Sequence, residues 1–141
     1  MGVRIRLRIV SVSGGEVITS ALVRTGFEAK TPQLLIPRTL AEKLRLWPPP
    51  HNSIPIEVRL LGVSTRGHIV PKALDVYVLT SDRVVGPVKC DAVVSESGGE
   101  VLISDYLAEE LKIAILAPKT GLWRFVDEDR VRVSEAPQHW L

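Results

Sequence analysis

Cysteine, closely spaced metal ligands and long apolar runs are all missing from this sequence. Cys90 is its one cysteine, so no disulfide can form within the chain. The histidines, His51, His68 and His139, lie far apart and lack the short spacing of zinc ligands, so we expect no metal and no cofactor. No apolar run approaches the roughly 20 residues of a membrane-spanning helix, and we expect no membrane association.

The start of the chain and its composition give two further expectations. Residues 1–6 lack the continuous apolar core of a signal peptide, which predicts a cytoplasmic protein. A formal net charge of +2 does not demand a nucleic-acid partner. Thermolabile residues are scarce, 12 of the 18 basic residues are arginine, and 24% of all residues are charged. This composition favours a thermophilic source, such as an archaeon.

The pattern of apolar residues predicts a mainly-β chain. At 141 residues, 45% of them apolar, it can bury one sizeable core. Apolar residues alternate with Arg4, Arg6 and Arg8, which predicts a half-buried strand over residues 3–12. Apolar runs bounded by turn residues predict further strands over residues 16–23, 34–36, 54–61, 68–71, 74–79, 84–94, 101–103, 113–117, 122–126 and 131–133.

Two short helices are predicted, each directly after a short buried strand. Pro37 suits the first position of a helix over residues 37–46, because its missing N–H would be unpaired there. Ser104 is a good N-cap for a helix over residues 105–112.

These elements predict a single domain over residues 1–135. Its N-terminal strand, residues 3–12, and its C-terminal strands, residues 122–133, are additions to a central unit. Residues 136–141 are predicted to form a tail, from which Trp140 could dock onto the domain.

The strand-to-helix unit occurs twice. Residues 35–46 align with residues 102–113 at an offset of 67, with six of twelve positions identical. Any strand that leads into an amphipathic helix gives part of this match, but the shared run Leu-Ala-Glu-x-Leu is more specific. The same offset places Asp91 at the repeat position of Arg24. The sequence therefore predicts two copies of one structural unit.

A short motif precedes the first copy. An apolar pair leads into Arg24, Thr25 and Gly26, and a short apolar run and a helix follow over residues 34–46. This arrangement resembles the active-site arm of the retropepsin-like (clan AA) aspartic proteases, in which an apolar pair precedes Asp-Thr-Gly or Asp-Ser-Gly. Arg24 stands where that family has its catalytic aspartate.

The resemblance implies a fold and an assembly. Residues 102–107 look like the second motif of the family, so we expect a retropepsin-like acid-protease barrel with two short helices. Members of the family pair as homodimers, and a homodimer is expected here. Residues 61–68 would form the flap over the cleft, with Gly62 and Gly67 bracketing the tip of its hairpin.

The family's chemistry requires two aspartates that share a proton, one from each subunit. Thr25 and Gly26 match the motif, but the guanidinium of Arg24 stays protonated and cannot act as the base. We therefore predict a pseudoenzyme that binds an extended peptide or an anion in a dimer cleft. An active peptidase that uses Asp91 or Asp105 as a substitute carboxylate is the alternative.

Within that cleft, the candidate binding residues are Arg24, Thr25, Gly26 and Glu28. Two Arg24 side chains that face each other across a dimer would repel. They could pair with Glu28 or Asp105, share an anion, which suits the guanidinium fork, or lie exposed in a dimer of different geometry.

A second alternative is a basic module that binds nucleic acid through Arg4, Arg6 and Arg8. Charges that protect an exposed edge strand from aggregation explain them more simply. The aromatic residues do not interleave with these arginines as a base-stacking platform requires. Cys90 is expected to be a plain strand residue, since nucleophilic catalysis needs a positioned histidine.

Overall fold

The structure, a computed structural model, describes residues 2–24, 26–60, 62–97 and 99–141. The described residues form ten strands and two short helices, which confirms the prediction of a mainly-β chain. The strands are β1 (Arg4–Ser11), β2 (Glu16–Val23), β3 (Gln33–Pro37), β4 (Ile54–Leu60), β5 (Val63–Leu79), β6 (Val84–Ser95), β7 (Val101–Ile103), β8 (Ile113–Ala117), β9 (Leu122–Phe125) and β10 (Arg132–Val133). The helices are α1 (Arg38–Lys43) and α2 (Asp105–Glu110).

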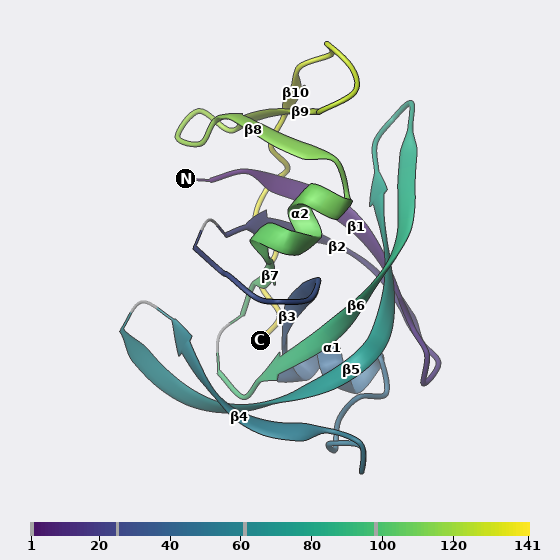
Figure 1. Cartoon of the computed structure of the whole chain (residues 1–141), viewed down its shortest axis with the longest axis vertical. Coiled ribbons are helices and arrows are strands. Elements are labelled where there is room, and N and C mark those ends of the chain that lie inside the picture. Colours follow the sequence, from purple (N-terminus) through teal and green to yellow (C-terminus); the bar gives the residue numbers. More distant parts are fainter. Residues whose placement is uncertain (1, 25, 61, 98) are drawn as a thin grey trace.

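Six strands close into a barrel in the order β1-β2-β7-β3-β6-β5, and an antiparallel pairing between β1 and β5 completes the ring. β4 pairs with β5 outside the ring and forms the edge of the seven-stranded sheet. Figure 1 shows the β4–β5 hairpin extending from one side of the barrel. The interpretation of the N-terminal arginines as part of an edge strand is wrong for Arg8, because β1 pairs with β2 and, from Leu7 onward, also with β5. Arg4 and Arg6 precede the pairing with β5.

The main hydrophobic core fills the barrel. On β1, Ile5, Leu7 and Ile9 are fully buried inside it, while the arginines between them belong to the outer face. This alternation is what a strand with one buried face requires. The helices add Leu40 from α1 and Leu107 from α2 to the same core, so the strand-to-helix units and the barrel bury one continuous interior.

The two copies of the repeat meet at a local two-fold axis. β3 and β7 pair antiparallel, with Leu35 opposite Leu102, and these two residues are equivalent in the repeat. Each strand also pairs in parallel with a strand from the other half, β7 with β2 and β3 with β6. The axis therefore passes between Leu35 and Leu102, in the wall of the barrel.

These parallel pairings give the structural counterpart of Arg24. When the two halves of the barrel are aligned through these pairings, β2 corresponds to β6 and Arg24 corresponds to Ser95. The placement of Asp91 at the repeat position of Arg24 is therefore wrong. The connection after β2, residues 24–32, is four residues longer than the connection after β6, residues 96–100, so the offset of 67 does not extend across it.

The β4–β5 hairpin has its tip at the pairing of Leu60 with Val63. Gly62 lies there with a φ of 78°, in the left-handed region that glycine adopts without strain. Leu61, the first residue of the predicted flap, lies outside the described residues. Gly67 is inside β5, between β4 and β6, so the prediction that it brackets the tip is wrong.

Both helices follow their strands as predicted, and both are shorter. Ser104 caps α2, since its Oγ accepts a hydrogen bond from the N–H of Leu107 at 3.2 Å. Pro37 is the N-cap of α1 and not its first helical residue. Arg45 (φ 58°) and Lys112 (φ 63°) take the left-handed conformation and end the helical runs. Neither of these described helices is long and apolar enough to cross a membrane.

A second, three-stranded sheet of β8, β9 and β10 packs against the barrel. Phe125 is fully buried and Trp123 is 3% exposed, and both belong to the main core. Their rings meet edge to face with centroids 5.1 Å apart. The C-terminal strands thus share one interior with the barrel.

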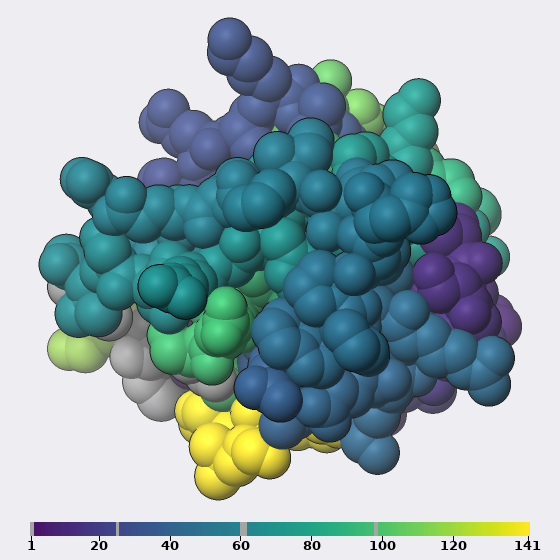
Figure 2. Space-filling model, turned by 90° about the horizontal axis from the view of Figure 1, so that it is seen from below, coloured from purple at the N-terminus to yellow at the C-terminus, as the bar shows by residue number. Residues whose placement is uncertain are grey.

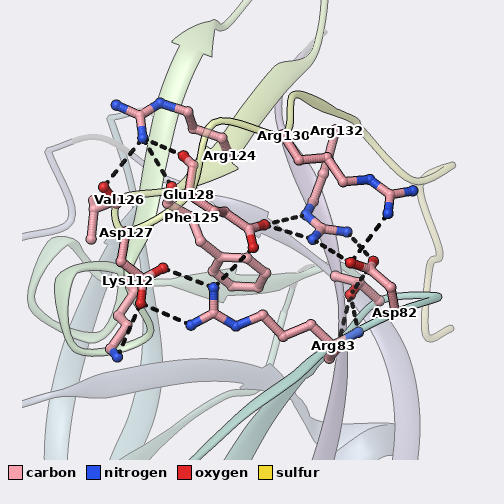
Figure 3. Close-up of polar contacts among 11 residues, drawn as sticks. Asp82, Arg83, Lys112, Arg124, Phe125, Val126, Asp127, Glu128, Arg130 and Arg132 are labelled. Carbon is pink, nitrogen blue, oxygen red and sulfur yellow. Dashed lines mark hydrogen bonds and ion pairs between the residues drawn. The ribbon is translucent and has the colours of Figure 1, made fainter.

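Ion pairs fasten this second sheet to the turn between β5 and β6 (Figure 3). Arg83 of that turn binds Asp127 at 2.8 Å and Glu128 at 3.1 Å. Arg132 binds Asp82 at 2.7 Å and Glu128 at 2.6 Å. The hydrogen bond from Arg132 is the main reason that the pKa of Asp82 falls to about 2. Several charges therefore act as one network, which stabilises more than an isolated surface pair does.

The predicted tail, residues 136–141, is packed against the barrel. The indole N–H of Trp140 donates to the hydroxyl of buried Thr19 at 3.0 Å, and the N–H of Ser20 donates to Gln138 Oε1 at 3.3 Å. In Figure 2 the C-terminal residues, in yellow, lie beside the blue segment that contains α1. The tail covers the part of β2 that the short strand β7 leaves without a neighbour.

Candidate functional site

A row of apolar side chains crosses the outer face of the barrel. The row, which we call the outer row, follows direct cross-strand partners through Leu22, Leu102, Leu35, Val93 and Ile69. Direct partners place their side chains on the same face of a sheet. With Val58 and Ile56 of β4 and Phe27, these residues form a hydrophobic cluster separate from the main core.

A groove of about 510 Å³ lies over Leu35 and Val93, two residues of this outer row. One wall is the loop after β2, the other wall is β4, and Leu35 and Val93 form the floor. The residues that line the groove are Arg24, Gly26, Phe27, Glu28, Gln33, Leu35, Ile56, Glu57, Val58, Arg59 and Val93. The β4–β5 hairpin borders the groove through β4, and no described residue of the predicted flap, residues 62–68, lines it.

Arg24 begins the first wall of the groove. Its backbone N–H donates to the carbonyl oxygen of Ile103 at 3.1 Å, which extends the pairing of β2 with β7. Its side chain is half-buried and lines the groove, and no carboxylate of the described residues lies within 4.0 Å of its guanidinium. The expected pairing of Arg24 with Glu28 or Asp105 is therefore not present as an ion pair within the single described chain. Thr25 lies outside the described residues.

Asp105 forms two hydrogen bonds with the loop after β2. Its Oδ2 accepts a hydrogen bond from the N–H of Gly26 at 3.2 Å, and its own N–H donates to the carbonyl oxygen of Phe27 at 3.0 Å. These two bonds fix the first wall to the start of α2. Asp105 does not line the groove; with Glu28 it borders a separate hollow beside α2.

Asp91 lies at the start of the pairing between β6 and β3, and it does not line the groove. Its Oδ2 accepts a hydrogen bond from the hydroxyl of Thr31 at 2.7 Å, and its Oδ1 accepts one from the N–H of Lys72 at 2.9 Å. Asp91 therefore links the side chain of Thr31 to the backbone at Lys72. The structure does not bring Asp91 together with Arg24 or Asp105.

Burial shifts the pKa values of two groups in the barrel wall. It raises the pKa of the Cys90 thiol well above its usual range, so this thiol stays protonated and unreactive. It lowers the pKa of His68, an effect that a hydrogen bond with the backbone of Leu46 only partly offsets. The His68 ring packs on Trp47, with centroids 5.6 Å apart, and its Nε2 has no hydrogen-bond partner in the described part of the chain.

The N-terminal arginines each have a carboxylate partner. Arg4 is bound by Glu100, and Arg6 binds Glu135 at 3.0 Å. Arg8 binds Glu16 at 2.6 Å and also lies over the ring of Tyr77. Because these charges are already paired, this face offers phosphate groups less positive charge than the sequence suggests.

Two parts of the groove were not predicted from the sequence. These are the wall formed by β4 and the outer row beneath it. The signal for the outer row was present, because Leu34, Leu35 and Ile36 form an unbroken apolar run where a half-exposed strand would alternate. The wall gives no such signal, since it depends on how the hairpin curves over the barrel.

Comparison with models of known protein families gives no match, and a search of curated proteins gives none either. In the described ranges, no group of three or more His, Cys, Asp or Glu side chains is placed to hold a metal ion. What the groove can bind must therefore be inferred from its own geometry. One wall is the charged loop after β2, the floor is apolar, and the other wall is the edge strand β4.

Proposed function

We propose that this chain is a non-catalytic relative of the retropepsin-like aspartic proteases, and that its groove binds an extended peptide. The observation that carries the proposal is the groove itself, bounded by the loop of Arg24, the outer row and the edge strand β4. The order of elements supports the relationship: an apolar strand leads into Arg24 and Gly26, and the two strand-to-helix units flank the β4–β5 hairpin.

Strand addition along β4 is the proposed mode of binding. Among the described strands, β4 pairs with β5 alone, so its other edge is free. Four successive residues, Ile56, Glu57, Val58 and Arg59, line the groove. Successive side chains of a strand point to opposite faces, so this lining means that the backbone edge faces the groove. Backbone hydrogen bonds would then supply affinity, and alternate side chains of the peptide would contact the half-buried Phe27 and Ile56.

Binding is better supported than hydrolysis. A protease of this kind needs two carboxylates that share a proton beside a water molecule. The carboxylates that line the described groove are Glu28 and Glu57, and Glu57 pairs with Arg59 at 3.3 Å. Asp91 and Asp105 each hold backbone groups through hydrogen bonds. With a permanent cation at Arg24, this arrangement favours a ligand over a nucleophilic water.

A homodimer, as in the family that the chain resembles, belongs to the proposal. It would bring two Arg24 side chains together, and their repulsion would be relieved by an anion or a ligand carboxylate between them. Light scattering coupled to gel filtration tests the assembly. A dimer whose stability falls in low salt and recovers with added anions is expected, and a monomer at all concentrations would contradict it.

Peptide binding is tested with labelled peptides of alternating valine and threonine, followed by fluorescence anisotropy and by amide shifts in NMR spectra. We expect the shifts to concentrate in residues 56–59 and in the loop after β2. Methylation of alternate peptide nitrogens removes the strand donors and should weaken binding about ten-fold or more. Uniform shifts over the whole barrel would contradict a defined groove.

A matched pair of variants locates the site. Ile56→Asp places a charge in the groove and should abolish binding, whereas Val84→Asp changes a 60% exposed valine at the start of β6 and should not. The same samples are assayed for cleavage at acid pH. Cleavage that a pepstatin-type inhibitor blocks would overturn the non-catalytic part of the proposal.

A further inference from the structure

Arg24 occupies a position at which the fold accepts a small residue. Its counterpart in the other half of the barrel is Ser95, which is fully buried and donates its hydroxyl to the carbonyl oxygen of Ser97 at 2.7 Å. A serine therefore completes the same strand end without a charge. The size and charge of Arg24 are not demanded by the barrel, and they act on the groove that Arg24 lines.

The first wall of the groove carries two opposite charges that are free to bind a ligand. Arg24 and Glu28 both line the groove, and neither has an oppositely charged partner within 4.0 Å among the described residues. The other wall is different, because Glu57 and Arg59 pair with each other at 3.3 Å. The unpaired charges thus lie on the loop after β2 alone.

The floor of the groove makes these charges selective. Leu35 is 3% exposed and Val93 is 4% exposed, so the apolar surface that a ligand can reach in the groove comes mainly from the half-buried Phe27 and Ile56. A charged group that enters such a groove loses part of its hydration, so it is tolerated where an opposite charge receives it. Charges across a binding surface decide between ligands more than they raise overall affinity.

We propose that the groove selects a peptide strand that carries one acidic and one basic side chain, with Arg24 binding the acidic group and Glu28 the basic group. The proposal rests on the proposed function, because it concerns the same groove. Apolar residues of the peptide lie on the floor between β4 and the loop. The order of the two charges along the peptide is then fixed by the direction in which the strand pairs with β4.

Five labelled peptides test this selection on the full-length chain. They share one alternating valine and threonine sequence, in which two sites on the same side of the strand hold Asp and Lys, Lys and Asp, two Asp, two Lys, or two Ser. One of the mixed-charge peptides should bind about ten-fold more tightly than the two-Ser peptide at low salt, and the like-charged peptides should bind more weakly than that mixed-charge peptide.

A charge exchange provides the decisive variant. Arg24→Glu combined with Glu28→Arg should reverse which mixed-charge peptide binds more tightly. The matched control exchanges a charge pair that does not line the groove, Arg8→Glu with Glu16→Arg, and should leave the preferred order unchanged. Thermal unfolding of each variant confirms that it is folded.

The outcomes separate this inference from the proposed function. Equal binding of the charged peptides and the two-Ser peptide would overturn the selection by charge and leave the peptide-binding groove intact. A preferred order that the exchange at Arg24 and Glu28 does not reverse would also overturn it. If none of the peptides binds, the proposed function fails as well.

Discussion

Gly67 is the point at which the β4–β5 hairpin crosses the barrel wall, and replacing it with alanine should loosen the hairpin. The residue pairs with Ile56 of β4 on one side and with Ser95 of β6 on the other. An added Cβ would lie 2.5 Å from the carbonyl oxygen of Val94 and 2.7 Å from Cγ2 of Val58, against 3.4 Å for ordinary contact. The hairpin and the barrel must therefore separate by several tenths of an ångström.

The loss of stability expected for Gly67→Ala depends on whether the neighbours of the added Cβ can move. Overpacking of a close contact costs roughly 1–3 kcal/mol. Val94 belongs to β6, which is paired with β3 and β5 and cannot shift alone, so we expect about 2–3 kcal/mol for Gly67→Ala. In a chain of 141 residues this lowers Tm by roughly 6–9 °C. Because Val58 lines the groove and must also move, peptide affinity should fall with stability.

Thermal unfolding followed by circular dichroism measures the change, with Gly99→Ala as the matched control. The nearest atoms to a Cβ at Gly99 lie at 3.6 Å, which is ordinary contact, so this variant should unfold within about 1 °C of the parent chain. If Gly67→Ala unfolds at the same temperature as Gly99→Ala, the hairpin is not held against the barrel at Gly67. The close packing of β4 against the barrel, on which this wall of the groove depends, would then be refuted.

Trp140→Ala should lower the free energy of unfolding by about 2–3 kcal/mol, measured in urea, because a partly buried indole and its hydrogen bond to Thr19 are lost. Burial lowers the pKa of His68 below 6.5, so protonation opposes folding; the free energy of unfolding should fall as the pH drops from 6.5 through the folded-state pKa, and less so in His68→Phe. Asp82→Asn should lower Tm at neutral pH, since the pKa of Asp82 is about 2 beside Arg132; this loss should disappear as the pH falls from 3.8 through about 2. An unchanged pH profile in either variant would contradict these assignments.

The repeat could be found in the sequence because it consists of residues whose surroundings the fold fixes. Leu40 of α1 and Leu107 of α2 are fully buried at equivalent places. Ala41 and Ala108 follow them, and both are buried. Strand and helix positions in both copies were therefore readable, together with the cap at Ser104, and they led to the mainly-β fold.

The remaining features depend on contacts between distant segments. A glycine in a hairpin turn and one at a strand crossing look alike in a sequence, and Gly62 and Gly67 show both cases. The offset of 67 was correct for the strand-to-helix units but failed for Asp91, because one connection is longer than the other. The docking site of Trp140 lies 121 residues away in the sequence, at Thr19, and no local sequence pattern predicts it.

The apolar runs of β3 and β7 show where the barrel wall must be covered from outside. A strand with one exposed face alternates, as β1 does with its arginines, but Leu34, Leu35 and Ile36 are all buried. Leu34 and Ile36 belong to the core inside the barrel, so the burial of Leu35 requires a cover on the outer face. β4 provides this cover through Val58. The groove begins where that cover ends, and the proposed peptide would extend the same cover by adding a strand to β4.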